Sequence, residues 1–361
     1  MKKTRLSSVA SLLAAGVLMG GCGADVGGES DSEGVAAQEP NVVGGEALGE
    51  AQQALNNNRR FDAFAEPSGP ARADLQVWRS SINAWFAARF SDGQGTGWTF
   101  NRASQPQDVP VSMNIDGDAL ADQVTWRPSD GVWHYRLSST NLQYQVQWGT
   151  AGDIPTPGDF DGDGKTDFAV WRPSNGYFYI ITSSNWTAVT RQWGTAGDIP
   201  VIGDYDGDTR DDIAVFRPSN GTWYYIRSST GVGVAIPWGQ ASDIPLVGDF
   251  DGDGRTDLTI FRPGNGHWWT LKSSTGTHTE TPWGSTCDVP LPADYDGDGK
   301  TDLAVRNLET AAHYYSNSST GVGVGVTYGL TTDVPANAST FCYINGKLGP
   351  CRSAACGPVG G

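Results

Sequence analysis

Carboxylates crowd into one short stretch of the chain, and their spacing points to a chemistry. In DFDGDGKTD, residues 159–167, aspartates occupy positions 1, 3, 5 and 9. Ionised carboxylates so close together repel one another strongly unless a cation neutralises them. Ca²⁺ takes about six to eight oxygen ligands, which alternate positions supply when glycine permits the chain to bend. The stretch therefore predicts a calcium-binding loop.

The same loop occurs five times at steps of 45 residues, which argues for metal binding over a solvated Asp-Gly turn. We predict side-chain ligands at positions 1, 3, 5 and 9 and a main-chain carbonyl ligand at position 7, for four to five structural Ca²⁺ ions. The predicted ligands are Asn114, Asp116, Asp118 and Asp122; Asp159, Asp161, Asp163, Lys165 and Asp167; Asp204, Asp206, Asp208, Arg210 and Asp212; Asp249, Asp251, Asp253, Arg255 and Asp257; and Asp294, Asp296, Asp298, Lys300 and Asp302.

The five loops differ at position 6, where a left-handed backbone suits glycine. Three copies have glycine there, whereas Thr209 and Ala119 stand in the other two and would be strained. Because the copy at 114–122 also has one carboxylate fewer, we expect it to be the weakest site. The loop is not an EF-hand, since Val170 replaces the glutamate expected at position 12 and strands flank the loop.

Strands must position these loops, because the chain repeats a strand-rich unit of 45 residues. One unit contains four candidate strands, at 201–205, 212–217, 222–227 and 232–238, and Asn-Gly or Asp-Gly between the second and third suits a two-residue hairpin. A degenerate copy at 73–86 brings the number of units to six. It lacks a full acidic loop, because Asp62, Glu66 and Asp74 are too far apart, so we expect no site there.

Four antiparallel strands per repeat predict an all-β fold, a β-propeller of six blades of four antiparallel strands. The first unit lacks its first strand, and residues 338–344 (ASTFCYI) stand where a seventh unit would begin. We therefore expect this C-terminal strand to complete the first blade and close the ring. Seven blades, using the preceding linker, is the alternative.

The DxDxDGxxD loop within a 45-residue β repeat resembles FG-GAP, or VCBS-type, calcium-binding repeats, which build the propeller of integrin α subunits and many bacterial surface proteins. The resemblance covers roughly residues 60–340. It implies structural calcium at the loop positions given above. It says little about activity, because such repeats occur in adhesins, lectin-like proteins and occasional enzymes.

The N-terminus reads as an export signal, with basic residues, a short apolar run and Gly-Gly before Cys22. This resembles a bacterial lipobox, so we expect Cys22 to be lipidated and the protein to be an outer-membrane or cell-surface lipoprotein; a secreted protein is the alternative. The expected division is a signal peptide at 1–21, an acidic tether at 22–57, the propeller at 58–345 and a Cys/Gly-rich tail at 346–361.

The net charge and the cysteine content limit which classes of partner and which cellular compartment we expect. A formal net charge of −16 repels nucleic acid, so we exclude a nucleic-acid partner, and we expect membrane contact only through the lipid anchor. Export permits disulfides, and four cysteines allow three pairings that the sequence leaves open. They are Cys287, Cys342, Cys351 and Cys356.

No motif for catalysis accompanies the loops, so we expect no enzymatic activity. The histidines (His134, His267, His278 and His313) lack a partner acid or nucleophile in the sequence, and regularly repeated aspartates suit a metal scaffold better than a glycosidase pair. We expect the repeated aromatic residues to wedge between blades, with stacking on sugar rings as the alternative. We expect the repeated arginines to pair across strands, with ligand contact as the alternative. These residues are Trp148, Trp193, Trp238 and Trp283, and Arg79, Arg127, Arg172, Arg217 and Arg262.

The sequence therefore predicts a monomeric, surface-anchored, calcium-stabilised module that binds or adheres to an extracellular carbohydrate or protein. Strand order places the Asn-Gly turns and the Trp-Gly connections on the face opposite the acidic loops, where we expect the ligand. A polysaccharide-degrading lyase or hydrolase, or a purely structural envelope lipoprotein, are the alternatives.

Overall fold

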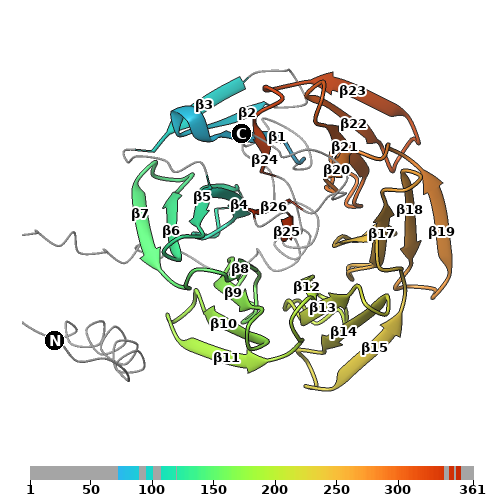
Figure 1. Cartoon of the computed structure of the whole chain (residues 1–361), viewed down its shortest axis with the longest axis horizontal. Coiled ribbons are helices and arrows are strands. Elements are labelled where there is room, and N and C mark those ends of the chain that lie inside the picture. The colour runs from blue at the N-terminus through green and yellow to red at the C-terminus, as the bar shows by residue number, and fades with distance from the viewer. Residues whose placement is uncertain are drawn as a thin grey trace, which may run out of the picture. The chain divides into compact units, whose positions relative to one another are not determined.

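Each 45-residue unit folds into one four-stranded antiparallel sheet, and six such sheets stand around a common axis (Figure 1). The structure is a computed structural model that describes residues 72–88, 95–100, 107–118, 120–336, 341–344 and 347–350, the last two ranges for the backbone alone. The prediction of a six-bladed β-propeller is confirmed.

The blades are numbered along the chain, and each is written from its innermost strand outward. Blade 1 contains β24 (Val334–Pro335), β1 (Leu75–Arg79), β2 (Ala84–Ala88) and β3 (Gly95–Thr99). Blade 2 contains β4 (Val109–Met113), β5 (Asp122–Arg127), β6 (Val132–Arg136) and β7 (Gln143–Gln147). Blade 3 contains β8 (Ile154–Pro155), β9 (Phe168–Arg172), β10 (Tyr177–Ile181) and β11 (Ala188–Gln192).

The remaining three blades repeat this plan. Blade 4 contains β12 (Ile199–Pro200), β13 (Ile213–Arg217), β14 (Thr222–Ile226) and β15 (Gly233–Pro237). Blade 5 contains β16 (Ile244–Leu246), β17 (Leu258–Arg262), β18 (His267–Leu271) and β19 (His278–Pro282). Blade 6 contains β20 (Asp288–Pro290), β21 (Leu303–Asn307), β22 (Ala312–Ser316) and β23 (Gly323–Thr327).

In the described part of the chain, two further elements lie outside the blade pattern. A single 3-10 turn, η1 (Ser80–Ile82), joins β1 to β2, and a hairpin of β25 (Phe341–Ile344) and β26 (Lys347–Pro350) follows the last blade. Among the described residues, no helix has the length and apolar character needed to cross a membrane.

Burial along the strands follows from their place in the ring. The second strand of blade 3, FAVWR, is buried at its first four residues, because neighbouring blades cover both faces of the sheet. The outermost strand β11 is exposed throughout. The core therefore lies between the blades, where aromatic pairs face one another across the second and third strands, such as Trp126 and Trp133 with ring centroids 5.0 Å apart.

Ring closure differs from the sequence prediction. The strand that completes blade 1 is β24, in which Val334 pairs with Trp78 and Pro335 with Val77. The predicted strand at 338–344 is wrong: its last four residues, β25, pair with β26. The reason is that Pro335 keeps the 45-residue step of the other innermost strands, so the chain completes the ring before residue 338 is reached.

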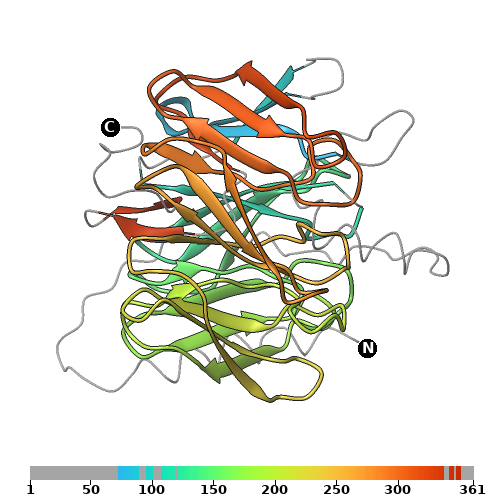
Figure 2. The ribbon, with the colours of Figure 1, turned by 90° about the vertical axis from the view of Figure 1, so that its right-hand side faces the viewer.

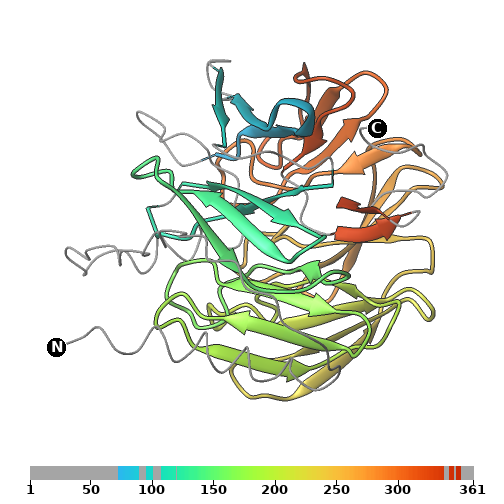
Figure 3. The ribbon, with the colours of Figure 1, turned by 60° about the vertical axis from the view of Figure 1, so that its left-hand side comes forward.

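The hairpin of β25 and β26 lies near the ring axis, where β25 approaches the inner strands β8 and β12 (Figure 1). Edge-on views place it toward one end of that axis (Figures 2 and 3). Its two strands are therefore an addition to the propeller and not a seventh blade.

The turns between the second and third strands also differ from the prediction. Arg172 pairs with Tyr177, so four residues, 173–176, connect the strands, and the amide of Gly176 donates to the carbonyl of Arg172 at 2.9 Å. Only the glycine of the Asn-Gly pair has a positive φ, 71° at Gly176. A two-residue hairpin would require positive φ at both residues, so that prediction is wrong.

An arginine–aspartate pair fixes the innermost strand to the second strand in five blades. In blade 3, Arg172 donates to both carboxylate oxygens of Asp153, at 2.7 and 2.9 Å, while its guanidinium lies 4.3 Å from the ring centroid of Tyr179. The predicted cross-strand role of the arginines is thus confirmed. The equivalent pairs are Arg79–Asp333, Arg127–Asp108, Arg217–Asp198 and Arg262–Asp243.

Replacement of Asp333 by alanine is expected to open the ring. Asp333 is fully buried and pairs with Arg79 at 2.7 Å, joining the last inner strand to the first blade. Removing one partner of a buried ion pair costs about 3–5 kcal/mol, which for a domain of this size lowers the melting temperature by about 10 °C. Asp243→Ala is the control, because it breaks the equivalent ion pair inside blade 5, away from the point where the ring closes. Thermal unfolding of Asp333→Ala at the wild-type temperature would contradict this account.

Candidate metal centres

The first aspartate of each acidic loop shapes the loop. In blade 3, one carboxylate oxygen of Asp159 accepts the amide of Gly162 at 2.7 Å, and the other accepts the amide of Gly164 at 2.9 Å. Both glycines have positive φ, 79° and 82°. The chain therefore curls around the side chain at position 1, as the repeated glycines predicted.

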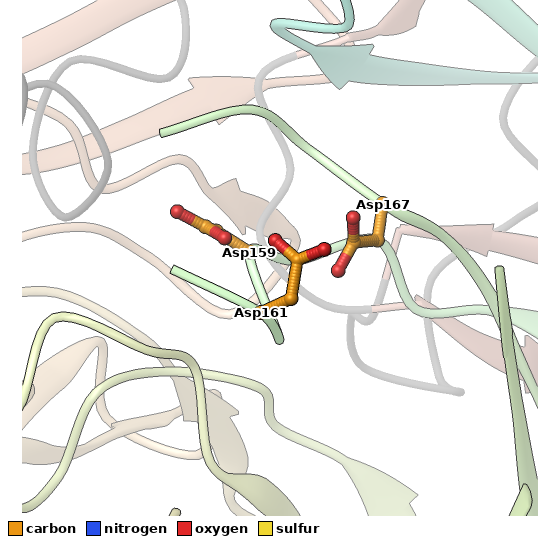
Figure 4. Close-up of side chains that lie close together, drawn as sticks. All are labelled: Asp159, Asp161 and Asp167. Atoms are coloured by element: carbon orange, nitrogen blue, oxygen red, sulfur yellow. The ribbon is translucent and has the colours of Figure 1, made fainter. Parts of the chain in front are cut away.

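Three carboxylates converge inside each of four loops. Ligand atoms of Asp159, Asp161 and Asp167 all lie within 4.8 Å of one another, and Figure 4 shows the carboxylates of Asp161 and Asp167 turned toward each other beside Asp159. The structure thus brings together positions 1, 3 and 9 of the predicted sets, while the position-5 aspartate is not in the group. The other three groups are Asp204, Asp206 and Asp212; Asp249, Asp251 and Asp257; and Asp294, Asp296 and Asp302.

A serine pair that the sequence reasoning missed lines each loop. Ser183 donates from its hydroxyl to Asp163 at 2.9 Å and from its amide to Asp167 at 2.6 Å, and the hydroxyl of Ser184 donates to Asp161 at 2.6 Å. The signal was present, because Ser-Ser recurs at the same 45-residue step. The equivalent pairs are Ser138 and Ser139, Ser228 and Ser229, Ser273 and Ser274, and Ser318 and Ser319.

The positions of these serines show which turns share a face of the ring. They lie in the turns between the third and fourth strands, whereas the acidic loops lie between the first and second. Their direct hydrogen bonds mean that both kinds of turn share one face of the ring. The Asn-Gly turns and the Trp-Gly connections therefore share the opposite face.

Burial and mutual repulsion make the loop carboxylates hard to ionise in the metal-free protein. For Asp167, burial first and then the charge of Asp161 raise the pKa to about 7; for Asp159, burial and then Asp211 do the same. Burial also raises the pKa of Asp122, Asp212 and Asp302 to about 7, and of Asp204, Asp257 and Asp294 to about 6. Either protons or a cation must supply the missing positive charge.

Orphaned oxygen atoms indicate that the loops are shaped for a cation. Oδ1 of Asp206 and Oδ1 of Asp251, both at position 3, are buried and accept no hydrogen bond within the protein. A buried carboxylate oxygen without a donor costs free energy, which a coordinated cation removes. The donor set is all oxygen, which suits Ca²⁺ or Mg²⁺ over softer metals.

The loop of blade 2 folds like the others despite its different first residue. Asn114 accepts the amide of Gly117 at 2.8 Å, and Asp122 accepts the amides of Ile115 and Ser138, both at 2.7 Å. Ala119 lies outside the described residues, so its expected strain stays a prediction. The same holds for the expected lack of a site in blade 1, because Asp62 and Glu66 lie outside them too.

Thr209 adopts the strained backbone predicted for position 6. Its φ is +77°, and its amide donates to Asp204 at 2.8 Å, as Gly164 does to Asp159. Because a left-handed backbone costs a β-branched residue about 1–2 kcal/mol, we expect Thr209→Gly to tighten calcium binding at this loop by about five- to thirtyfold at most. Calcium titration of the variant checks this, with Thr230→Gly in the turn of the same blade as control. Weaker binding by Thr209→Gly would contradict the strain argument.

The repeated tryptophans wedge between blades, as expected. The indole of Trp148 is 5 % exposed and donates to the carbonyl of Tyr179 in the next blade at 3.0 Å. Trp193 donates in the same way to Tyr224 at 3.0 Å. Trp148 therefore has no free face on which a sugar ring stacks.

Each of the four histidines lies in a strand of a blade. In blade 6, Arg306 and His313 replace the aromatic pair of other blades. Both side chains are buried, and they contact each other at 2.6 Å. Burial and the charge of the arginine keep the pKa of His313 well below its usual value. His267 contacts Glu280 at 2.7 Å on the surface of blade 5, and His278 packs against Trp238. His134 is buried in β6.

Three predicted features fall largely outside the described residues. The signal peptide, the acidic tether and Cys22 all precede residue 72, so they stay predictions. Cys287 is disulfide-bonded, in agreement with the expected use of the cysteines. The side chains of Cys342, Cys351 and Cys356 are not described, so the pairing stays open.

A comparison with known protein families agrees with the repeat. The family model described as FG-GAP-like repeat matches residues 159–215, 204–260 and 249–305. No curated protein matches the chain.

Solved structures similar to this chain are distant. A lectin from Agrocybe aegerita that recognises non-reducing terminal N-acetylglucosamine is 13% identical, with a TM-score of 0.48, over 73% of this chain and 78% of that one. A streptogramin B lyase is 11% identical, with a TM-score of 0.47, over 74% of this chain and 86% of that one. A chain from a nidogen–laminin complex is 8% identical, with a TM-score of 0.46, over 71% of this chain and 93% of that one.

Proposed function

We propose that this chain, a six-bladed propeller in which residues 159–215, 204–260 and 249–305 match FG-GAP-like repeats, is a calcium-stabilised binding or adhesion module for an extracellular carbohydrate or protein. The observation that carries the proposal is the convergence of three aspartates in each of four loops, in two of which a buried oxygen atom, Oδ1 of Asp206 or of Asp251, lacks a donor.

In this proposal, positions 1, 3, 5 and 9 hold Ca²⁺ through their side chains, and position 7 contributes its carbonyl. In blade 3 these are Asp159, Asp161, Asp163 and Asp167, with Lys165 at position 7. The ion neutralises the repulsion between carboxylates and holds the loop between the first two strands. The blade 2 loop, with an asparagine first, is the weakest of the five sites.

The ligand surface is proposed on the face opposite these loops. In blade 3 this face presents Tyr177 and Tyr179, half-buried and with ring centroids 6.1 Å apart, beside Arg172. Asn175 donates to the hydroxyl of Tyr179 at 2.9 Å and fixes its ring. Tyrosine and arginine are enriched in binding interfaces, and rigid aromatic rings bind with little loss of side-chain freedom.

The proposed anchoring rests on the sequence alone. Lipidation of Cys22 would hold a monomeric propeller at the outer surface of a bacterium, with residues 22–57 as the tether. Export of the full-length protein followed by mass analysis of its N-terminal peptide tests this, and a peptide without a lipid on Cys22 favours the secreted form.

Glycan-array binding of the purified propeller tests the binding proposal. We expect Tyr177→Ala with Tyr179→Ala to abolish binding while calcium content stays unchanged, and a chelator to abolish binding only at temperatures at which the metal-free propeller is unfolded. Tyr144→Ala, on the outer strand of blade 2, is the matched control. Release of products from a polysaccharide would favour an enzyme. Unchanged binding by the tyrosine variant would refute this ligand face.

A further inference from the structure

Neighbouring acidic loops are joined by hydrogen bonds across the blade boundary. The residue at position 8 of the blade 4 loop, Asp211, donates its amide to the carbonyl of Asp159 in blade 3 at 2.7 Å. In return, the amide of Asp159 donates to Oδ2 of Asp211 at 2.8 Å. Two bonds therefore hold the main chain of the position-1 residue of one loop to position 8 of the next.

Among the described residues, the same two-bond link recurs at two further blade boundaries, and a single main-chain bond occurs at two more. Thr166 exchanges both bonds with Asn114, at 2.7 and 3.0 Å, and Thr301 exchanges both with Asp249, also at 2.7 and 3.0 Å. The amide of Thr256 donates to Asp204 at 2.6 Å. The blade 6 loop is joined to blade 1 through the amide of Ala73, which donates to Asp294 at 2.7 Å.

A second contact lies beside each link. The side chain at position 7 covers the glycine at position 4 of the preceding loop: a Cβ added at Gly162 would lie 3.0 Å from Cγ of Arg210, and one at Gly117 would lie 3.2 Å from Cε of Lys165. Gly207 and Gly252 are covered in the same way by Arg255 and Lys300. Each loop therefore touches the preceding loop through two consecutive residues.

We propose that Thr166, Asp211 and Thr301 are positioning residues that couple the calcium sites of adjacent blades. The inference rests on the proposed calcium sites. Position 8 lies between the carbonyl ligand at position 7 and the carboxylate ligand at position 9, so an ion that closes its own loop fixes position 8. The hydrogen bonds of position 8 in turn hold the main chain of the first ligand of the neighbouring ion.

The coupling is expected to be modest and to act between neighbours. A hydrogen bond of this kind contributes about 0.5–1.5 kcal/mol, which corresponds to roughly a two- to tenfold change in affinity per junction. Linkage makes the effect reciprocal: each ion tightens its neighbour by the factor by which the neighbour tightens it. Calcium therefore fills the loops cooperatively along the series from blade 2 to blade 6.

Calcium titration of the full-length protein by calorimetry tests this coupling. We expect a Hill coefficient above one for the wild type, and a lower coefficient with unchanged stoichiometry for the combined variant Thr166→Val, Asp211→Ala and Thr301→Val, in which the link through Thr256 remains. The matched variant Thr166→Ser, Asp211→Asn and Thr301→Ser keeps an acceptor at each position and should retain the cooperativity, which a merely structural role of these residues would not predict.

Two results would overturn the coupling: a wild-type Hill coefficient of one, or equal cooperativity in the Val/Ala and Ser/Asn variants. If the combined variant fails to fold, Thr301→Val alone is titrated, and an unchanged isotherm refutes the proposal. A wild-type protein that binds no calcium refutes the proposed function itself, so the two failures are distinguishable.

Discussion

Removal of calcium is expected to lower the melting temperature by roughly 20–40 °C near neutral pH. An ion that binds only the folded protein stabilises it by about 2.7 kcal/mol when its concentration is a hundred times its Kd, so four equal sites give roughly 10 kcal/mol. For a domain of this size each kcal/mol corresponds to about 2–4 °C. Thermal unfolding followed by circular dichroism, in excess calcium and in excess chelator, measures the difference.

The loop carboxylates are the reason for so large an effect. Without a cation, two buried aspartates and one half-buried aspartate lie within 4.8 Å of one another in at least four loops, as at Asp159, Asp167 and Asp161. Asp167→Asn is the control, since it removes one carboxylate charge from one loop and should lose at most the share of that ion. Equal melting temperatures with and without calcium, in a protein shown to be metal-free, would refute the calcium sites.

Repetition made the fold predictable, because every landmark that recurs in sequence recurs in space. The aromatic pairs, the arginines and the acidic loops fall at one step, and each occupies the same place in its blade. Ring closure was missed although the same periodicity contained it: Asp333 and Pro335 continue the series of Asp288 and Pro290, and they form the last inner strand. Residues 338–344 were predicted to close the ring because they stand where a seventh unit would begin, but the closing strand already ends at Pro335.

Local turn chemistry was a weaker guide than periodicity. Asn-Gly is common in two-residue hairpins, yet the register of β9 and β10 leaves a four-residue turn in which glycine alone is left-handed. The glycine is required by packing: a Cβ at Gly176 would lie 2.4 Å from the carbonyl oxygen of Gly194. Close approach between two turns is a tertiary effect that a dipeptide preference does not contain.

The candidate metal sites were predictable where ligands lie in one loop and not where partners come from elsewhere. Positions 1, 3 and 9 converge as their spacing predicted. The serines that bond the position-3 and position-5 aspartates come from a turn about 20 residues later, and position 8 reaches the preceding blade. Such contacts depend on how strands and blades stack, which only the three-dimensional structure defines.

The pH dependence of stability is expected to reverse sign when calcium is removed. In the metal-free protein, the pKa of Asp159, Asp167 and Asp212 is raised to about 7, whereas an unfolded aspartate has a pKa near 3.9. The folded protein therefore binds more protons than the unfolded chain between these values. Its free energy of unfolding falls as the pH rises from about 4 to about 7, by several kcal/mol in total, and then levels off.

Calcium changes this because it competes with those protons for the same oxygens. Below about pH 6 the protonated carboxyls bind the ion poorly, so in excess calcium the melting temperature should rise with pH over the interval in which it falls in chelator. Melting curves across this range in both conditions measure the two slopes. Asp122→Asn with Asp302→Asn should flatten the chelator slope, because burial raises the pKa of both residues to about 7. Parallel slopes in calcium and chelator would show that the ion does not bind at these carboxylates.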